Sequence, residues 1–279
     1  MIEQSGTFTL GDRKVHRLGF GAMRITGEGI WGEPADRKEA EAVLRRAIEL
    51  GIDLFDTADS YGPDVSERLI GEVLHPYPPQ LVIATKGGLT RPGPNEWRRN
   101  GRPEHLRQAC EGSLRRLELE TIELYQLHAP DPDVPLEESL GALVDLQREG
   151  KIRHIGVSNF QVPELERSVK VARIVSVQNR YNLADRGSQA VLDWCERQEI
   201  GFLPWKPLHV EGLEDGPLAR IAAGHGATPR QIALAWLLHR SPVMLPIPGT
   251  SSVRHLEANA AAARIRLAPE EVQTLNALA

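Results

Sequence analysis

Short apolar runs alternate along the chain with longer stretches in which apolar residues recur at helical spacing. Such an alternation predicts strand–helix units arranged around a parallel sheet. Eight strands are expected, and they cover residues 18–21, 54–56, 81–85, 123–127, 152–157, 175–178, 202–205 and 244–247.

The stretches between the predicted strands carry helix signals. Residues 104–117 and 136–149 each place apolar side chains on one helical face. Gly51 and Gly150 stand where the C-terminal caps of helices are expected. Thr228 begins a capping box that has proline at the first helical position.

Eight strands, each followed by a helix, predict an α/β fold of the (β/α)8 type, a TIM barrel. We expect one domain over residues 1–279, because such barrels often reach this length. Residues 7–18 predict an N-terminal β-hairpin and residues 267–278 an extra C-terminal helix, both as covers for the barrel ends. The alternative is an open doubly wound sheet, but no G-x-G-x-x-G motif follows the first strand.

The composition is ordinary for a soluble globular protein, with 41% hydrophobic and 25% charged residues. The formal net charge of -5 gives no reason to expect nucleic acid or an anionic membrane as the main partner. Two cysteines, Cys110 and Cys195, form no disulfide framework and favour a cytoplasmic location. The N-terminus lacks a secretory signal pattern, and no apolar run approaches the roughly 18 residues of a membrane span.

Polar side chains follow the predicted strands at the point where each strand ends. Asp56 and then Tyr61 follow the second strand, Lys86 the third and His128 the fourth. In a barrel of this type, the carboxyl ends of the strands lie on one face and supply the catalytic residues. Each residue alone has an ordinary structural interpretation, such as a turn former or a solvated lysine. Four titratable residue types on three consecutive strand ends nevertheless favour an active site.

Other chemistries fit these residues less well. Asp56, Asp59 and His128 are the only plausible metal ligands, and Lys86 would compete with a cation, so no metal is expected. A glycosidase pair of Asp56 with Asp59 or Asp131 would leave the tyrosine and the lysine without roles. A serine nucleophile is disfavoured because no G-x-S-x-G motif occurs.

The four side chains suit the protonation of a carbonyl oxygen. A phenol with a pKa of about 10 is a proton donor at neutral pH, and a nearby ammonium stabilises its anion. Lys86 would supply that ammonium, Asp56 would hold Lys86, and His128 would donate an N–H to the developing oxyanion. None of these groups is a reductant, so the hydride must come from a cofactor.

Six ordered motifs resemble those of the aldo-keto reductase superfamily, and the resemblance covers nearly the whole chain. The motifs are "GFGAM", "DTADSYG", "ATKGG", "YQLHAPD", "IGVSNF" and "VQNRYN", one at each of the first six strands. Within the superfamily, the sequence is similar to bacterial general aldo/keto reductases and to pyridoxal-reductase-like enzymes. The resemblance implies a barrel that binds an extended nicotinamide dinucleotide at its carboxyl end without a Rossmann motif.

The resemblance also implies a function. Tyr61 is expected to be the acid/base, tuned by Lys86 and Asp56, and His128 is expected to orient the carbonyl. The implied reaction is the NADPH-dependent reduction of an aldehyde or ketone to an alcohol. The alternative is a regulatory or sensor subunit that binds the nucleotide with little turnover, which the intact set of four disfavours. The sequence predicts a small-molecule carbonyl partner, but not the natural substrate, the favoured direction or the oligomeric state.

The implied cofactor site begins at the nicotinamide. Ser158, Asn159 and Gln178 would bind its carboxamide, and Trp205 stands where the family usually has a tyrosine stacked on the ring. The complete expected set is Gly21, Ala22, Met23, Asp56, Ser158, Asn159, Gln178, Trp205, Pro207, Leu208, Gly249, Thr250, Ser251, Ser252, Arg254, His255 and Asn259.

Two loops are expected to hold the rest of the dinucleotide. Residues 206–216 would cross the pyrophosphate, and residues 249–259 would hold the adenosine end. For Thr250, Ser251 and Ser252, a plain helix cap is the alternative interpretation.

The choice of cofactor depends on the second of these loops. Many family members carry a lysine where Gly249 stands and an arginine near His255, whereas here Arg254 lies one place earlier. NADPH is expected because Arg254, Ser251 and Ser252 would serve a 2′-phosphate, and NADH is the alternative.

The loop after the third strand bears on the substrate. Residues 87–103 are rich in glycine and proline and carry Trp97 with the arginines 91, 98, 99 and 102. This loop is either a solvated surface segment or a means to bring an arginine, with Arg98 and Arg99 as candidates, to an anionic substrate. The expected substrate pocket consists of Trp31, Tyr61, Trp97 and His128.

Overall fold

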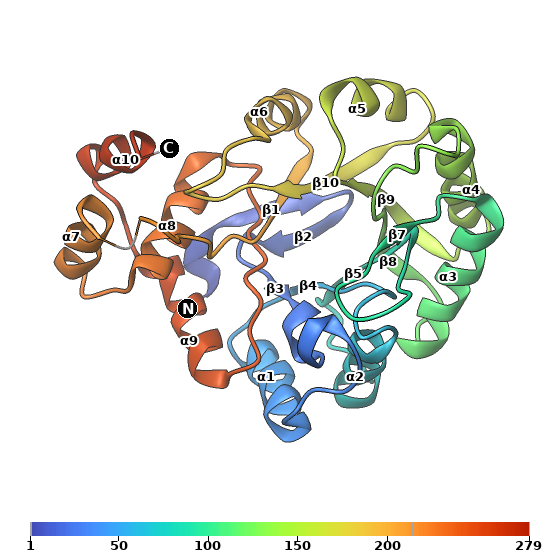
Figure 1. The fold of residues 1–279 in the computed structure, drawn as a ribbon, viewed down its shortest axis with the longest axis horizontal. Helices are drawn as coiled ribbons and strands as arrows, with labels where there is room; N and C mark the ends of the chain where they lie inside the picture. The colour runs from blue at the N-terminus through green and yellow to red at the C-terminus, as the bar shows by residue number, and fades with distance from the viewer. Residues whose placement is uncertain (1, 214, 279) are drawn as a thin grey trace.

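A closed ring of parallel strands surrounded by helices forms the centre of the molecule in the computed structural model (Figure 1), which describes residues 2–213 and 215–278. Seven strands pair in parallel in the order β3–β4–β5–β8–β9–β10–β11. Their bounds are Phe20–Gly21, Leu54–Asp56, Val82–Gly87, Ile122–Leu127, Ile152–Ser158, Ile174–Arg180 and Gly201–Trp205. The predicted (β/α)8 barrel is confirmed.

The eighth predicted strand, residues 244–247, differs from the expectation. Residues 243–249 lie between β11 and β3 and bond to both, but they form isolated bridges instead of a regular strand. Phe202 donates to the Val243 carbonyl at 2.8 Å, and Gly19 donates to the Pro246 carbonyl at 2.9 Å. Pro246 and Pro248 have no N–H to donate, so regular pairing cannot form here although the barrel still closes.

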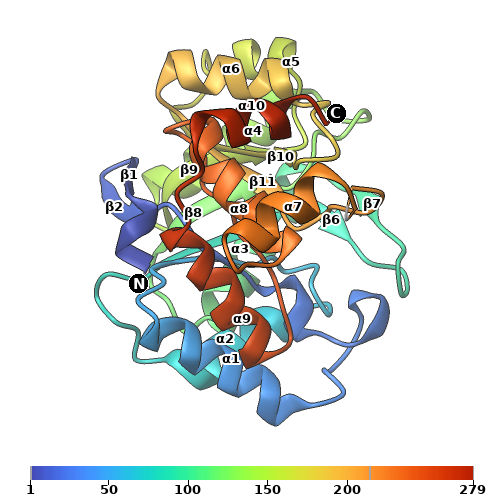
Figure 2. The same cartoon turned by 90° about the vertical axis from the view of Figure 1, so that its left-hand side faces the viewer.

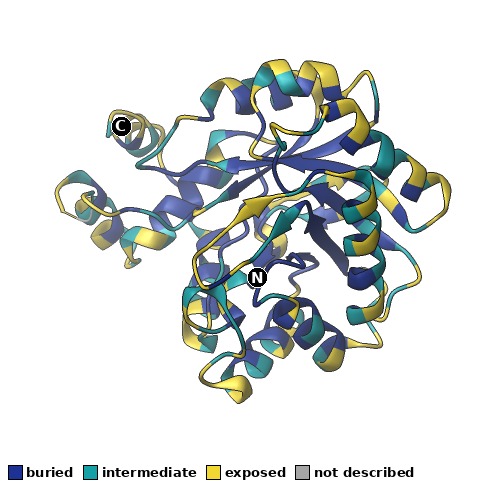
Figure 3. Cartoon of the chain, turned by 45° about the vertical axis from the view of Figure 1, so that its right-hand side comes forward, coloured by how far each residue is buried: buried dark blue, intermediate teal, exposed yellow. Residues whose placement is uncertain are grey.

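The helices lie outside the ring. Those that follow the eight barrel segments are α1 Arg37–Glu49, α2 Val65–Leu74, α3 Pro103–Arg116, α4 Leu136–Arg148, α5 Val162–Ser168, α6 Gln189–Gln198, α8 Pro229–Arg240 and α9 Val253–Ala261. Their inward faces are buried and their outward faces exposed, as Figure 3 shows. The predicted helix ends are confirmed: Gly51 and Gly150 have φ of +84° and +76°, and Thr228 forms its capping box with Gln231.

The hairpin of β1 (Thr7–Leu10) and β2 (Arg13–His16) covers the amino end of the barrel. Its buried residues Leu10 and Val15 join the apolar cluster inside the ring, which includes the inward side chains of several strands. Gly201, the first residue of β11, lies against Leu10. The hairpin and its location are therefore as predicted, and the carboxyl end of the barrel is the end that stays open to ligands.

The extra C-terminal helix exists but does not cover a barrel end. Helix α10 (Pro269–Asn276) packs on α8 and on a further helix, α7 (Pro217–Gly224), at the outside of the ring (Figure 2). Trp236 of α8 donates its indole N–H to the Asn276 side chain at 2.8 Å. The helix itself is as predicted, and its location against α7 and α8 differs from the expectation.

The remaining elements are short. They are the 3-10 turns Ile2–Ser5, Ala22–Ile25, Glu28–Ile30 and Ala262–Arg264 and the small strands β6 Leu89–Thr90 and β7 Arg98–Arg99. Within the described residues, no helix is both long enough and apolar enough to cross a membrane.

Candidate active site

The four candidate catalytic residues come together at the carboxyl end of the barrel. Asp56 is the last residue of β4, and Tyr61 follows in the loop before α2. Lys86 lies near the end of β5, and His128 comes directly after β8. All four side chains are buried, so their charges and protons are governed by one another more than by water.

The ammonium of Lys86 is the centre of this cluster. Its Nζ lies 2.8 Å from Asp56 Oδ2, 2.8 Å from the Thr57 carbonyl oxygen and 3.3 Å from the Tyr61 hydroxyl. An ammonium has three N–H donors, and these three contacts match them. Since Lys86 is 0% exposed, it depends on these partners for the hydrogen bonds that water would otherwise provide.

The second oxygen of Asp56 is held by two amides. Oδ1 accepts from Gln178 Nε2 at 2.8 Å and from Gln126 Nε2 at 3.3 Å. Gln178 was expected only as a carboxamide ligand, yet one end of it is bound to the catalytic cluster. Gln126 was missed, because what distinguishes it is its pairing in register with Lys86, which the sequence does not reveal.

Burial and charge together set the protonation of Lys86 and Tyr61. Burial alone would lower the pKa of Lys86, but the nearby Asp56 and Tyr61 reverse this and raise it. For Tyr61, burial raises the pKa more than the adjacent Lys86 lowers it. The lysine is therefore charged and the phenol carries its proton at neutral pH.

The imidazole of His128 is neutral. Burial, together with the charge of Lys86, lowers its pKa well below the ordinary value. Its ring lies edge-on to Tyr61 with 5.9 Å between the ring centroids, and its Nδ1 is 3.4 Å from the Ser60 hydroxyl. A neutral ring that keeps one N–H donor is suited to bind a carbonyl oxygen.

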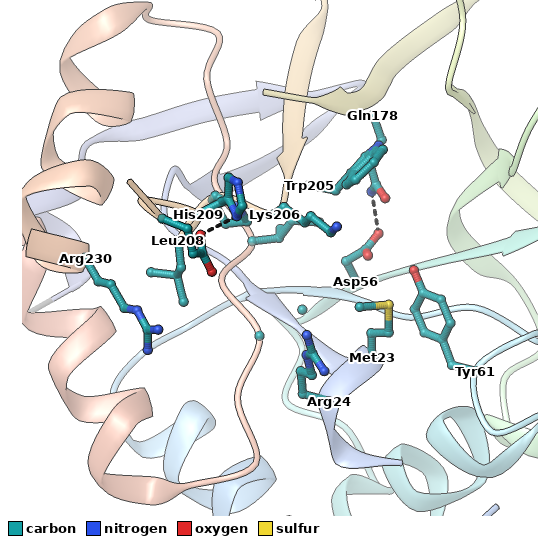
Figure 4. A pocket seen from close by; sticks show the side chains of 15 residues that line it. Met23, Arg24, Asp56, Tyr61, Gln178, Trp205, Lys206, Leu208, His209 and Arg230 are labelled. Carbon is teal, nitrogen blue, oxygen red and sulfur yellow. Dashed lines mark hydrogen bonds and ion pairs between the residues drawn. The ribbon is translucent and has the colours of Figure 1, made fainter. Parts of the chain in front are cut away.

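A cavity of about 460 Å³ opens beside this cluster (Figure 4). Tyr61 and the following expected cofactor residues line it: Gly21, Met23, Asp56, Gln178, Trp205, Pro207, Leu208 and Gly249. The other expected cofactor residues lie outside its lining: Ala22, Ser158, Asn159, Thr250, Ser251, Ser252, Arg254, His255 and Asn259. The cavity thus gathers most of the residues expected around the nicotinamide and pyrophosphate, but not Ser158 and Asn159, and of the expected adenosine loop it includes Gly249 alone.

Neither Ser158, which is buried, nor Asn159, which is exposed, lines the cavity. Asn159 donates to Ser158 Oγ at 3.1 Å and to the His128 carbonyl at 3.0 Å, and it accepts from the Trp205 indole at 3.1 Å. Asn159 adopts φ of +63°, a left-handed conformation that asparagine tolerates better than most residues. These bonds connect the Trp205 ring to the catalytic cluster.

The loop at residues 249–259 supplies the start of α9. Ser252 is the N-cap residue, but its side chain makes no capping bond, whereas Thr250 Oγ1 accepts from the Ser252 N–H at 3.1 Å. Arg254 is exposed and lies 3.4 Å from the His255 ring. Asn259 Nδ2 is buried without a hydrogen-bond partner among the described residues.

Three cations that line the cavity were not expected individually as cofactor residues, although Lys206 begins the expected pyrophosphate loop. They are Arg24, Lys206 and Arg230, and they stand around it on separate elements (Figure 4). Arg24 directly follows the predicted Met23 and Lys206 directly follows Trp205, so both were one position from the expected set. Arg230 sits in the first turn of α8, where the capping box already gave it a structural interpretation. The other lining residues that were not expected individually are His209 and Glu211, which belong to the expected pyrophosphate loop, and Ile247.

Part of the expected pyrophosphate loop lines the same cavity. Of residues 206–216, positions 206–209 and 211 line the cavity, and Glu214 lies outside the described residues.

Of the four expected substrate residues, Tyr61 lines the cavity, and Trp31, Trp97 and His128 do not. Trp97 packs edge-on against Tyr61 and His128, with centroid separations of 6.4 Å and 6.3 Å. Trp31 forms a backbone bridge with Gly62, close to Tyr61 in the chain. Arg98, an exposed residue of β7, was proposed to meet an anionic substrate, and no contact of its side chain tests this.

Comparisons with known proteins show which family the chain resembles. The family model described as "Aldo/keto reductase family" matches residues 17–279. An uncharacterized oxidoreductase of Schizosaccharomyces pombe is 48% identical over 96% of this chain and 88% of its own length. A pyridoxine 4-dehydrogenase of Escherichia coli is 42% identical over 98% of each chain. A crystal structure of an aldo/keto reductase from Klebsiella pneumoniae in complex with NADP and acetate matches with a TM-score of 0.84 and 30% identity, over 98% of this chain and 94% of that one. The chain therefore belongs to the aldo/keto reductase family.

Proposed function

We propose that this protein is an NADPH-dependent oxidoreductase that reduces an aldehyde or ketone to an alcohol. The observation that carries this proposal is the buried contact of the Lys86 ammonium with both Asp56 and the Tyr61 hydroxyl at the edge of the cavity. This arrangement places a protonated phenol next to the group that stabilises its anion. A structural ion pair would not need the phenol, the neutral histidine or the open cavity.

The cavity fits a nicotinamide dinucleotide phosphate. Trp205 offers a flat face in the cavity that Gln178 and Tyr61 also line, and Arg24, Lys206 and Arg230 offer positive charge for phosphate groups. The relatives solved with NADP or NADPH, at 30% identity over 98% of this chain, support the same choice. When bound, this cofactor supplies the hydride that no side chain of the cluster provides.

The side chains handle the proton and the developing charge. Tyr61 donates its phenolic proton to the carbonyl oxygen, and the Lys86 ammonium at 3.3 Å stabilises the tyrosinate that remains. Asp56 keeps the lysine charged and in place. His128, neutral at physiological pH, donates an N–H to the same oxygen and orients the carbonyl. In the reverse direction, the tyrosinate would take the proton of the alcohol.

Pyridoxal is the first substrate to test. The relative named pyridoxine 4-dehydrogenase is 42% identical to this chain over nearly all of both sequences. We propose in addition that residues 1–279 form a single domain, in which the hairpin of β1 and β2 precedes residues 17–279 that match the family model. A cytoplasmic location is supported by two buried free thiols, Cys110 and Cys195.

The test is NADPH oxidation by the purified protein with pyridoxal, 4-nitrobenzaldehyde, methylglyoxal and a keto-sugar. Turnover of at least one carbonyl is expected, with NADPH preferred over NADH. Tight binding of NADPH without turnover of any carbonyl would instead favour the regulatory or sensor subunit.

A further inference from the structure

The guanidinium of Arg91 lies where three loops meet beside the catalytic cluster. These loops are the one that follows β3, the one that follows β4 and the one that joins β6 to β7. Arg91 donates Nε to the Glu96 carbonyl at 2.7 Å, NH1 to the Ile30 and Ser60 carbonyls at 2.9 and 3.0 Å, and NH2 to the Gly29 and Gly93 carbonyls at 2.9 and 3.4 Å.

These contacts use the whole donor capacity of the side chain. A guanidinium has five N–H donors, and Arg91 directs them to five carbonyl oxygens on three loops. Among the described residues, no carboxylate forms an ion pair with it. Arg91 therefore has no donor left for an anionic substrate, and its role is to bind protein backbone.

The same guanidinium packs against tryptophan rings. Its central carbon lies 3.8 Å from the centroid of a Trp97 ring and 5.7 Å from that of Trp31. An arginine over an aromatic face is favourable and fixes the orientation of the ring. Trp97 also contacts Tyr61 and His128 edge-on, so Arg91 sets the position of an aromatic wall, formed by Trp97, beside the reacting groups.

The wall keeps apolar surface available to a ligand. Trp97 remains 37% exposed although it touches two buried catalytic side chains. The loops are also joined by backbone, since Asn95 donates to the Gly29 carbonyl at 3.1 Å. Gly29 has φ of +66°, and a side chain there would come within 3.0 Å of Pro94. This close approach places the Trp31 and Trp97 loops side by side.

We infer that Arg91 is a positioning residue that holds Trp97 beside Tyr61 and His128, and that the resulting wall selects carbonyl groups attached to a flat aromatic or heteroaromatic ring. A planar ring next to the carbonyl packs on the indole and adds an aromatic contact, whereas a short aliphatic chain covers less of it. This inference rests on the proposed function, because it assigns the substrate class of the same site.

The test compares an aromatic and an aliphatic aldehyde in matched variants. Arg91→Met and Trp97→Leu are each assayed with 4-nitrobenzaldehyde and with butanal, and Arg102→Met, an exposed arginine of the same loop, is the control. Both variants should raise KM for the aromatic aldehyde by about tenfold or more and change its kcat and both constants for butanal by less than about twofold. The double variant should be no worse than Trp97→Leu, because Arg91 acts through Trp97.

Three outcomes would overturn the inference. If KM rises equally for both aldehydes, Arg91 has a purely structural role. If KM and kcat do not change for either aldehyde, Arg91 has no role in selection. If the effects of the two substitutions add in the double variant, Arg91 does not act through Trp97. If Arg91→Met does not fold, Arg91→Lys takes its place, because lysine keeps the charge but cannot make the five-donor fork.

A binding measurement separates this inference from the proposed function. Quenching of tryptophan fluorescence by 4-nitrobenzyl alcohol reports on the wall without turnover, and Arg91→Met should weaken it by about tenfold. Selective weakening in a protein that turns over no carbonyl would contradict the reductase function alone. Unchanged quenching in an active enzyme would contradict the role of Arg91 alone.

Discussion

Tyr61 and Lys86 each shift the pKa of the other. Burial raises the pKa of the Tyr61 phenol, and the ammonium of Lys86 limits that rise. Reduction needs the protonated phenol and is therefore supported across neutral pH. Alcohol oxidation needs the tyrosinate, so its rate should increase as the pH approaches the raised pKa of Tyr61.

Replacement of Lys86 by methionine tests this pairing. Without the ammonium, the pKa of Tyr61 should rise further, and the alkaline limb of the oxidation profile should move to higher pH. The kcat of reduction should fall by about 100-fold or more, because the tyrosinate loses its stabilising charge. Both are measured as rates against pH, with the exposed Lys170→Met as the control. A pH profile of oxidation that does not shift would show that Lys86 does not tune the pKa of Tyr61.

The candidate catalytic residues could be predicted from the sequence because their positions follow from topology. Asp56, Lys86 and His128 stand at strand ends, where a parallel barrel gathers its polar groups. Gln126 could not be distinguished from an ordinary residue inside a strand, since the strand register that pairs it with Lys86 is a tertiary feature. The positioning role of Arg91 was also missed, because a charged residue in a glycine-rich loop is usually solvated.

At the scale of elements, local signals predicted starts and ends better than packing partners. The alternation of apolar residues located the strands, but the prolines at 246 and 248 prevented regular pairing in the eighth segment. Residues 267–278 predicted the extra helix α10 but not its location on α7 and α8. A helix cap, in contrast, depends only on neighbours in the chain.

The capping box of α8 gives a stability prediction. Thr228 Oγ1 accepts from the Gln231 N–H at 3.3 Å, and the Gln231 side chain accepts from the Thr228 N–H at 2.9 Å. Thr228→Ala should lower the free energy of unfolding by about 1 kcal/mol. Denaturant unfolding measures this, and Thr228→Ser, which keeps the hydroxyl, should retain most of the stability. A loss of equal size in both variants would show that the cap is not responsible.

Over the whole molecule, the net charge conceals a local excess of positive charge. The chain carries -5 overall, yet Arg24, Lys206 and Arg230 stand around one cavity. Composition alone gave no reason to expect an anionic ligand, because a sum over the surface does not report where charges meet. The fold brings these three residues together from different elements.

Replacements of Arg230 and of Arg254 are expected to affect NADPH and NADH in different ways. Arg230→Met should raise KM for NADPH and NADH alike by about tenfold, because both carry the pyrophosphate that this residue would meet. Arg254→Ala should weaken the binding of NADPH more than the binding of NADH if Arg254 binds the 2′-phosphate. Arg240→Met, at the opposite end of α8, is the control. An unchanged preference in Arg254→Ala would exclude Arg254 from that role.

The central claim is that Tyr61 supplies the proton. Its most direct test is the kcat of Tyr61→Phe for carbonyl reduction, with NADPH affinity measured on the same protein and Tyr77→Phe as a matched tyrosine outside the site. A fall in kcat of about 100-fold or more with unchanged NADPH binding is predicted. Turnover at the wild-type rate in Tyr61→Phe would contradict the mechanism.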